Sequence, residues 1–202
     1  MNEKYYDALL NIKTDGEQMG FNHSFHYHRY EPTPYSGLEI LFNEYKLEPS
    51  DRVVDFGCGK GRLLFYIHHL FKSYVTGIEM NEDLHGNAVE NKKRFLKKHR
   101  SANDKIHFHC CLAEKYDIHP LDNRFYFFNP FTIQIFMKVV NNILGSVEQS
   151  KRDVELILYY SSEDYIFYLE NQTSFELTNE IIIPDLYRHN SNEKFLIYIN
   201  HS

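Results

Sequence analysis

The sequence predicts an α/β fold built on one mostly parallel sheet, and three observations point to it. From residue 51 onward, short apolar strands alternate with segments of helical spacing, which is the rhythm of βαβ units. The first of these strands runs directly into a glycine-rich loop that opens a helix. The last two strands have little helix-forming sequence between them, so we expect an antiparallel hairpin at the end of the sheet.

The individual elements follow from hydrophobic periodicity and turn residues, taken in chain order. Residues 5–12 have an amphipathic pattern and residues 16–35 are rich in glycine, histidine and aromatic side chains, so we expect a helix followed by an ordered loop. Pro32 and Pro34 disfavour helix before them, and Ser36 is expected to cap a helix over 37–45. The strands expected next cover residues 53–56, 74–79, 106–111, 125–129, 154–160, 175–183 and 194–200. The helices expected between them cover residues 62–71, 83–99, 132–144 and 163–170.

Composition indicates one compact domain with a small accessory segment. The chain has 202 residues, of which 43% are hydrophobic and 25% charged, so it can form a core and is not predicted to be disordered. We expect residues 1–35 to form an N-terminal helix and lid, and residues 36–202 to form the main domain. The formal charge of -6 disfavours a protein that depends on non-specific phosphate contacts.

The sequence also predicts a cytoplasmic protein with no membrane segment. Its first residues lack the basic stretch followed by an apolar one that marks a secretory signal. The longest apolar runs, such as residues 63–67, are far shorter than the roughly 20 residues that span a bilayer. Cys58, Cys110 and Cys111 are odd in number and two are adjacent, so we expect reduced thiols rather than a disulfide framework.

The most informative motif is the glycine loop after the first strand, over residues 57–61. Glycines there let the backbone turn sharply and approach a ligand, while the next helix offers its free N–H groups to polar ligand atoms. Arg62 stands where a dinucleotide motif has its third glycine, which disfavours a pyrophosphate site. A phosphate loop of the Walker type is also disfavoured, because neither Ser nor Thr follows Lys60.

An acidic residue complements this loop. Glu79 ends the second strand, 22 residues after Gly57, where a carboxylate can accept both hydroxyls of a ribose held over the glycines. Alone, each feature has a simpler interpretation, namely a structural turn and a solvated Glu. Their joint occurrence at this spacing predicts a nucleoside-binding site.

These residues carry a family resemblance. The segment from Asp55 to Gly61, followed by Gly77-Ile78-Glu79, closely resembles the class I S-adenosylmethionine-dependent methyltransferases over about residues 36–200. The resemblance implies a Rossmann-like seven-stranded mixed sheet in the order 3-2-1-4-5-7-6, flanked by helices, with S-adenosylmethionine as cofactor. The cofactor-binding residues that it implies are Asp55, Gly57, Cys58, Gly59, Gly61, Glu79, Met80, Ala113 and Glu114. Within this set, the glycines and Asp55 face the amino-acid part, Glu79 the ribose, and residues 113–114 the adenine.

The end of the fourth strand is the expected acceptor site. Asn129-Pro130-Phe131 resembles the Asn-Pro-Pro-aromatic motif of methyltransferases that act on planar nitrogens, although Phe131 stands at the second Pro position. The resemblance implies that Asn129 and Pro130 accept hydrogen bonds from a target amine and that an aromatic ring stacks on it. A structural alternative is a helix start with Asn129 as cap and Pro130 in the first turn. Aromatic residues expected in the lid are Phe25, Tyr27, Tyr30 and Tyr35.

We therefore expect an enzyme that methylates a small molecule or a protein side chain. A nucleic-acid base is a less favoured acceptor, and a non-catalytic cofactor-binding regulatory or scaffold protein is the alternative from another class. No metal site is expected, because His107, His109 and Cys111 alternate with apolar residues along a strand. The basic run over residues 92–100 has helical spacing and is interpreted as a solvated helix face.

Overall fold

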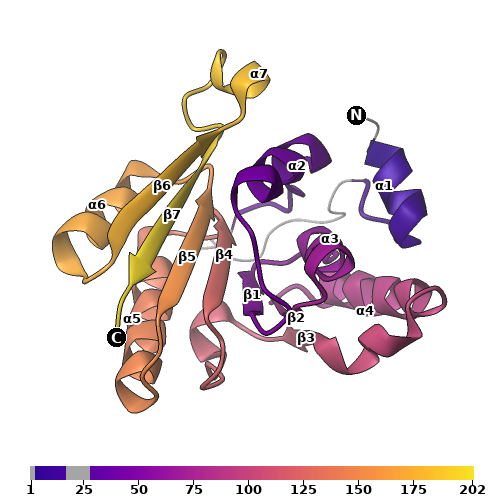
Figure 1. Ribbon diagram of the computed structural model, residues 1–202, viewed down its shortest axis with the longest axis horizontal. Coiled ribbons are helices and arrows are strands. Elements are labelled where there is room, and N and C mark those ends of the chain that lie inside the picture. Colours follow the sequence, from indigo (N-terminus) through magenta and orange to yellow (C-terminus); the bar gives the residue numbers. More distant parts are fainter. Residues whose placement is uncertain (1–2, 17–27) are drawn as a thin grey trace.

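The computed structural model describes residues 3–16 and 28–202, and these form a seven-stranded sheet in the order β3-β2-β1-β4-β5-β7-β6 (Figure 1). The strands are β1 (Arg52–Phe56), β2 (Tyr74–Glu79), β3 (Ile106–Cys110), β4 (Arg124–Phe128), β5 (Val154–Tyr159), β6 (Glu176–Ile182) and β7 (Lys194–Asn200). Strands β1 to β5 pair in parallel, whereas β7 is antiparallel to both β5 and β6. The predicted α/β class, strand order and closing hairpin are confirmed.

Helices cover both faces of this sheet (Figure 1). They are α1 (Glu3–Leu10), α2 (Tyr35–Glu44), α3 (Arg62–Phe71), α4 (Glu82–Leu96), α5 (Ile133–Gln149), α6 (Glu163–Gln172) and α7 (Pro184–Tyr187). Two short 3-10 turns, η1 (Arg100–Lys105) and η2 (Ala113–Lys115), flank β3. None of the described helices combines the length and apolar composition that crossing a bilayer requires.

Alternation along the central strands divides the interior into two cores. Val53 of β1 and Tyr126 of β4 face the core formed with α1, α2, α3 and α4. Val54 of β1 and Phe125 of β4 face the opposite core, which α5 and α6 cover. Because both faces are buried, these strands read as continuous apolar runs, and each fully buried large side chain stabilises the fold by about 1.5–3 kcal/mol. The first strand is thereby fixed in place at the point where it enters the glycine loop.

Several helix boundaries differ from the sequence-based expectation, including the end of α4 at Leu96 rather than at residue 99, and two of them concern α2 and α5. Helix α2 begins at Tyr35 with Pro34 as its N-cap and no side-chain cap, so the prediction that Ser36 is the cap was wrong. Tyr35 therefore lies in the first turn of the helix. Its ring is fully buried and stacks on that of Tyr6, with 4.7 Å between the ring centroids. Helix α5 continues past 144 to Gln149, because Val147 extends its buried face.

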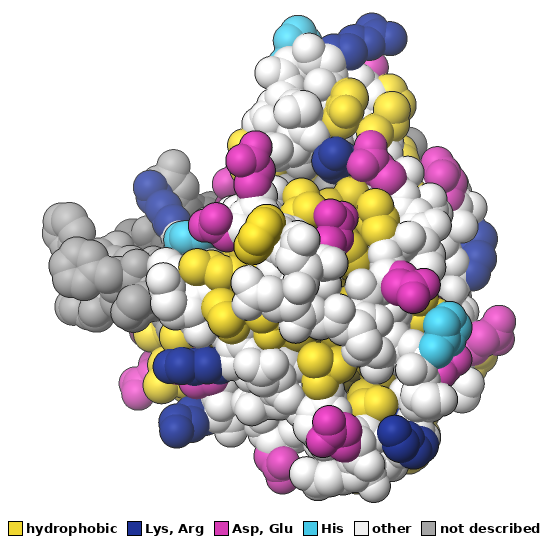
Figure 2. All heavy atoms as spheres, turned by 90° about the vertical axis from the view of Figure 1, so that its left-hand side faces the viewer, with side chains coloured by type: hydrophobic (Ala, Val, Ile, Leu, Met, Phe, Trp, Pro, Cys, Tyr) yellow, Lys and Arg dark blue, Asp and Glu magenta, His cyan; other side chains and the backbone are white. Residues whose placement is uncertain are grey.

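The sheet ends in an exposed edge strand. Residues 176–180 of β6 are exposed, and Figure 2 shows apolar side chains on this side of the molecule with acidic side chains around them. Exposed large hydrophobic residues on α6, β6 and α7 are Phe167, Leu177, Ile182 and Leu186. Glu176 and Glu180 supply charge on the strand itself, which discourages pairing with another open edge.

The N-terminal segment is fastened to α3 by Arg62. This side chain is 6% exposed, donates from Nε to Thr14 Oγ1 at 2.8 Å and forms an ion pair with Glu3. Its guanidinium also donates to the Thr33 carbonyl at 3.3 Å and lies 4.6 Å from the ring centroid of Tyr35. One buried cation therefore ties α1, the loop after it and the start of α2 to the helix that follows the glycine loop.

We expect Arg62→Ala to lower the free energy of unfolding by about 2 kcal/mol, because Glu3 and Thr14 lose a buried cation. Lys93→Ala is the matched control, since Lys93 pairs with Glu90 at 3.5 Å on the exposed face of α4. Its loss should cost less than about 0.5 kcal/mol. Urea unfolding followed by circular dichroism measures both, and equal losses would contradict the anchoring role of Arg62.

Candidate active site

The glycine loop joins β1 to α3 at the carboxyl edge of the parallel strands. Gly57, Gly59 and Gly61 have φ of 84°, 53° and 85°, in the left-handed region that favours glycine. The amides of Gly57 and Cys58 both donate to the carbonyl of Ile78, at 2.9 and 3.1 Å. These bonds curl the loop against the end of β2 and leave Gly57 exposed. The backbone is thereby open to a ligand at the edge of the sheet where α/β proteins bind their ligands.

Glu79 fixes the middle of this loop from the end of β2. Its Oε2 accepts the Gly59 amide at 2.9 Å, and its Oε1 accepts the Asn81 amide at 2.8 Å. The side chain is 7% exposed, and burial raises the pKa of its carboxyl while the backbone N–H bonds oppose that shift. Each carboxylate oxygen can accept more than one hydrogen bond, so Glu79 retains acceptor capacity.

Asp55 is buried close to Glu79 without comparable compensation. It lies on β1 two residues before Gly57 and is 5% exposed. No group in the described part of the chain donates a hydrogen bond to its carboxylate, and burial and the Glu79 charge raise its pKa to about 8. A buried carboxylate without a donor or cation is costly, so this position favours a positively charged ligand group.

Residues 28–33, here called the strap, cross over the glycine loop. The Tyr30 ring lies directly above Gly59, where a Cβ would come within 2.0 Å of Tyr30 Cε2. The Tyr30 hydroxyl donates to the Thr14 carbonyl at 3.0 Å, and Lys60 Nζ lies 5.3 Å from the ring centroid. The glycine at 59 therefore accommodates an aromatic ring of the same chain.

Both ends of the strap are held by the sheet. The His28 amide donates to the Pro130 carbonyl at 2.9 Å, and His28 Nδ1 lies 2.6 Å from the Asn129 carbonyl oxygen. At the other end, the hydroxyls of Thr33 and Tyr126 share a buried hydrogen bond of 2.7 Å. The strap thus spans from the end of β4 to the middle of the same strand.

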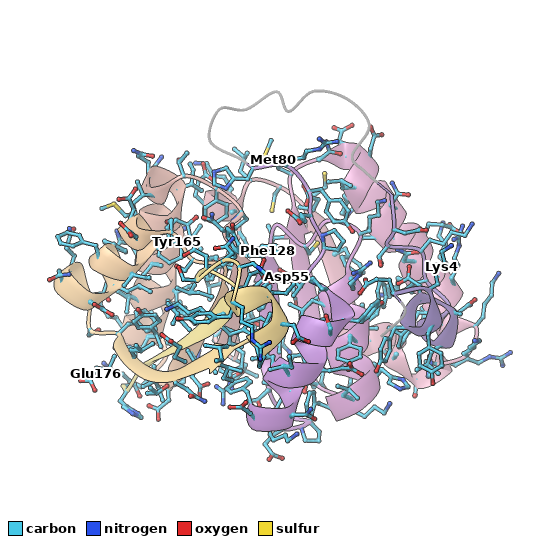
Figure 3. All side chains as sticks on the ribbon, turned by 90° about the horizontal axis from the view of Figure 1, so that it is seen from above. Lys4, Asp55, Met80, Phe128, Tyr165 and Glu176 are labelled. Carbon is cyan, nitrogen blue, oxygen red and sulfur yellow. The ribbon has the colours of Figure 1, made fainter. Side chains whose placement is uncertain are left out.

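Two small cavities flank the strap. Both are lined by Tyr30, Glu31, Gly57 and Phe128. The larger, of about 60 Å³, is also lined by Glu79 and Met80 and is here called the Glu79 cavity. The smaller, of about 30 Å³, is also lined by Asp55 and Cys58 and is here called the Asp55 cavity. Figure 3 shows Asp55 and Phe128 close together, with Met80 on the same side. Small-molecule sites usually enclose about 300–1,000 Å³, so a nucleoside-sized ligand requires the strap to move.

The segment after β4 is strained and partly turned inward. Asn129 has a φ of 38°, and its side-chain Oδ1 is buried with no hydrogen-bond partner. The structural alternative of a helix start is wrong, because Thr132 caps α5 and neither Asn129 nor Pro130 belongs to it. The Phe131 ring is fully buried, 6.2 Å from that of Phe127, so it lies in the core and not in the two cavities.

Other residues expected at the site lie elsewhere. Ala113 is buried in the core beneath α5, and Glu114 accepts a bond from Asn142 at 3.1 Å on the outer side of that helix. Tyr35 is buried under α1, where its hydroxyl donates to Asp7 at 2.8 Å. Tyr27 lies outside the described residues, as does Phe25. Of the expected lid residues that are described, Tyr30 is the one that lines the cavities.

Among the residues that line both cavities, two were missed by the sequence analysis. Glu31 and Phe128 line both cavities. Phe128 directly precedes Asn129 at the carboxyl end of β4, and this position alone could have indicated it. Glu31 lies in a segment without periodicity, so its direction could not be read from a pattern. Among the described residues, no group of three His, Cys, Asp or Glu side chains is arranged to hold a metal ion.

Comparison with known proteins rests on structure alone. No protein-family model matches the chain, and no curated protein matches it in sequence. An RNA methyltransferase from Salinibacter ruber in complex with S-adenosyl-L-homocysteine has a TM-score of 0.57 at 16% identity, covering 84% of this chain and 92% of that one. An rRNA methylase from Streptococcus thermophilus has a TM-score of 0.55 at 15% identity, covering 81% and 94%.

The same likeness extends to an enzyme of different chemistry. The [4+2]-cyclase SpnF has a TM-score of 0.60 at 12% identity, covering 88% of this chain and 87% of that one. At such identities a structural match establishes the fold and leaves the reaction open, because one fold hosts many chemistries. The chain therefore has the Rossmann-like fold that these enzymes share.

Proposed function

We propose that this protein is an S-adenosylmethionine-dependent methyltransferase that binds its cofactor over the glycine loop. The fold, the exposed Gly57 and the acidic end of β2 support this proposal. In it, Glu79 accepts the ribose hydroxyls, and Gly57, Cys58, Gly59 and Gly61 contact the amino-acid part. Residues 1–35 act as the lid of a catalytic domain formed by 36–202.

Asp55 is the single observation that carries the proposal. Its carboxylate is buried, lacks a donor among the described residues and lies beside a second acid. S-adenosylmethionine carries a sulfonium and an ammonium, and either cation beside Asp55 would stabilise the ionised carboxylate that burial disfavours in the unliganded protein. A neutral nucleoside would offer Asp55 no such compensation.

The chemistry requires little of the side chains. The bound cofactor supplies an already activated methyl group, so the protein must align the acceptor with it and exclude water. Asn129 Oδ1 is a buried hydrogen-bond acceptor without a partner, which suits an N–H donor on the methyl acceptor and favours transfer to nitrogen. The Pro130 carbonyl already accepts from His28, and Phe131 is enclosed in the core, so we assign neither of them a contact with the acceptor.

One observation favours a second candidate of another class. The Tyr30 ring occupies the space above Gly59, which also suits a non-catalytic protein that has retained the fold and lost the cofactor. The two candidates differ in whether S-adenosylmethionine binds at all. The cofactor-binding measurement described next therefore distinguishes them.

Asp55→Asn should weaken S-adenosylmethionine binding at least about tenfold, because a neutral amide replaces the counter-charge of the cofactor. A smaller loss for S-adenosylhomocysteine, whose sulfur is neutral, would assign the sulfonium to Asp55, whereas an equal loss would assign the ammonium that both ligands carry. Titration calorimetry measures both ligands, with the exposed Asp117→Asn as matched control. Unchanged affinity in the Asp55 variant would refute the assigned pocket, and absence of binding to the wild type would favour the non-catalytic candidate.

Asp55→Asn should also alter the pH dependence of stability in the unliganded protein. With a pKa of about 8 in the folded state against 3.8 ordinarily, Asp55 retains a proton that the unfolded chain releases. Its contribution to the free energy of unfolding therefore declines as pH rises between these two values. The variant lacks this decline and should be the more stable protein at pH 8. Urea unfolding from pH 5 to pH 8 measures the difference, and parallel curves would contradict it.

Tyr30→Ala should increase the association rate of S-adenosylhomocysteine several-fold, because the ring no longer has to leave the space above Gly59. Tyr30→Phe retains the ring and loses the bond to the Thr14 carbonyl, so its rate should stay near that of the wild type. Stopped-flow fluorescence with a labelled analogue measures these rates. An alanine variant no faster than the wild type would show that the ring is not the barrier.

A further inference from the structure

The acceptor side of the cavities has an aromatic wall. Phe128 ends β4, Tyr159 ends β5 and Tyr160 follows it, and the centroid of Phe128 lies 4.5 Å from that of Tyr159 and 6.3 Å from that of Tyr160. Phe128 and Tyr160 are half-buried, while Tyr159 is enclosed behind them. Tyr160 has a φ of 54°, uncommon for a bulky residue, and its hydroxyl accepts from Asn190 at 2.6 Å. Phe128 lines both cavities, and the two tyrosine rings lie beside it at the carboxyl edge of the sheet.

Carboxylates stand beside this wall. Glu193 accepts a hydrogen bond from the Tyr159 hydroxyl, and Glu31 lines both cavities together with Phe128. Both acids raise the pKa of Tyr159, which places their charges near the same hydroxyl. Asp55 lines the smaller cavity without a hydrogen-bond donor among the described residues, so a cationic ligand beside it would favour the ionised form of its carboxyl.

The cations around the site are engaged or lie at its rim. Lys60 donates to the carbonyls of Asp15 and Gly16, and Arg62, which lines the Asp55 cavity, is ion-paired with Glu3. Arg29 is exposed and lines the Glu79 cavity, on the side away from Asp55. The acceptor side is therefore suited to a positively charged ligand.

The basic run of α4 does not extend to this site. Helix α4 begins at Glu82, close to the cavities, and its 15 residues lead away for about 22 Å. Lys93 and Arg94 lie in its last turn, and Lys97 and Lys98 follow. A phosphate backbone attracted to this run would contact the far end of α4, away from the cavities.

We propose that the methyl acceptor is a cationic amine, carried on a flat or aliphatic group that packs on Phe128 and Tyr160, with Glu31 and Glu193 as specificity-determining residues. The inference rests on the proposed function. Rings and carboxylates together bind an ammonium through cation–π and charge contacts. Asn129 lines neither cavity, but its Oδ1 is buried without a partner in the turn that follows Phe128, where it is available to one N–H of the same group once the strap moves.

Methyl transfer to this amine conserves atoms and charge. The bound ammonium first releases a proton to water, leaving a neutral nitrogen with a lone pair. That nitrogen forms a bond to the methyl carbon while the carbon–sulfur bond breaks and its electron pair stays on sulfur. The methylated nitrogen carries the positive charge that sulfur loses, and the carboxylates of Glu31 and Glu193 face a cation both before and after the step.

The test uses binding of two probes of equal shape to the full chain saturated with S-adenosylhomocysteine. We expect 2-phenylethylamine to bind at least about tenfold more tightly than the neutral 2-phenylethanol by titration calorimetry. Glu31→Gln and Glu193→Gln should each reduce the preference for the amine about fivefold, and Glu193→Gln, which lies outside both cavities, should do so without changing S-adenosylhomocysteine affinity. The exposed Glu148→Gln on α5 is the matched control and should leave the preference unchanged.

The outcomes separate this inference from the proposed function. A wild type that fails to bind S-adenosylhomocysteine would overturn both. Binding of S-adenosylhomocysteine with equal affinity for the amine and the alcohol would overturn the inference alone. Tight, strongly salt-dependent binding of a short oligoadenylate with no preference for the amine would also overturn it, and would assign a nucleic-acid acceptor instead.

Discussion

Two acids buried side by side at the carboxyl edge of the sheet are the constraint on which the site depends. Glu79 is compensated by the amides of Gly59 and Asn81, and those bonds hold the glycine loop in its left-handed turns. Asp55 receives no such bond from the described residues. Glu79 therefore stabilises the loop, whereas Asp55 remains a buried carboxyl without a compensating donor. Without a cation the pair destabilises the fold, a cost that proteins accept at binding sites.

Arg62 accounts for the difference between this glycine loop, over which the strap packs, and the loop of a dinucleotide site, which binds a pyrophosphate. A third glycine there would permit the close helix–strand packing of a dinucleotide site, whereas the arginine anchors α1 and the residues before α2 to helix α3. The strap then has fixed points at Thr33 and His28, with Tyr30 between them above Gly59. The same anchoring that stabilises the N-terminal segment holds an aromatic ring where a ligand would lie.

The elements that sequence patterns predicted correctly are those whose side chains repeat with a period. Strands such as β1 and β4 are apolar on both faces, so their positions follow from composition, while the strand order came from the family resemblance. Motif position does not determine side-chain direction. Phe131 was expected at an acceptor site and is in the core, because the turn at Asn129 points it inward. The contribution of Tyr30 and Glu31 depends on tertiary anchoring of a segment without periodicity.

The charge arrangement has a consequence for turnover under the proposed function. Asp55 and Glu79 would attract S-adenosylmethionine more strongly than the product of transfer, because the product keeps the ammonium and loses the charge compensation of the sulfonium. Loss of that compensation again raises the pKa of Asp55 and favours its protonation, which weakens the hold on the spent cofactor. Meanwhile Glu31 and Glu193 face a product that is still cationic. The electrostatics of the site thus assist release of the cofactor product. The methylated amine, in contrast, must leave past the strap while the carboxylates of Glu31 and Glu193 still attract its positive charge.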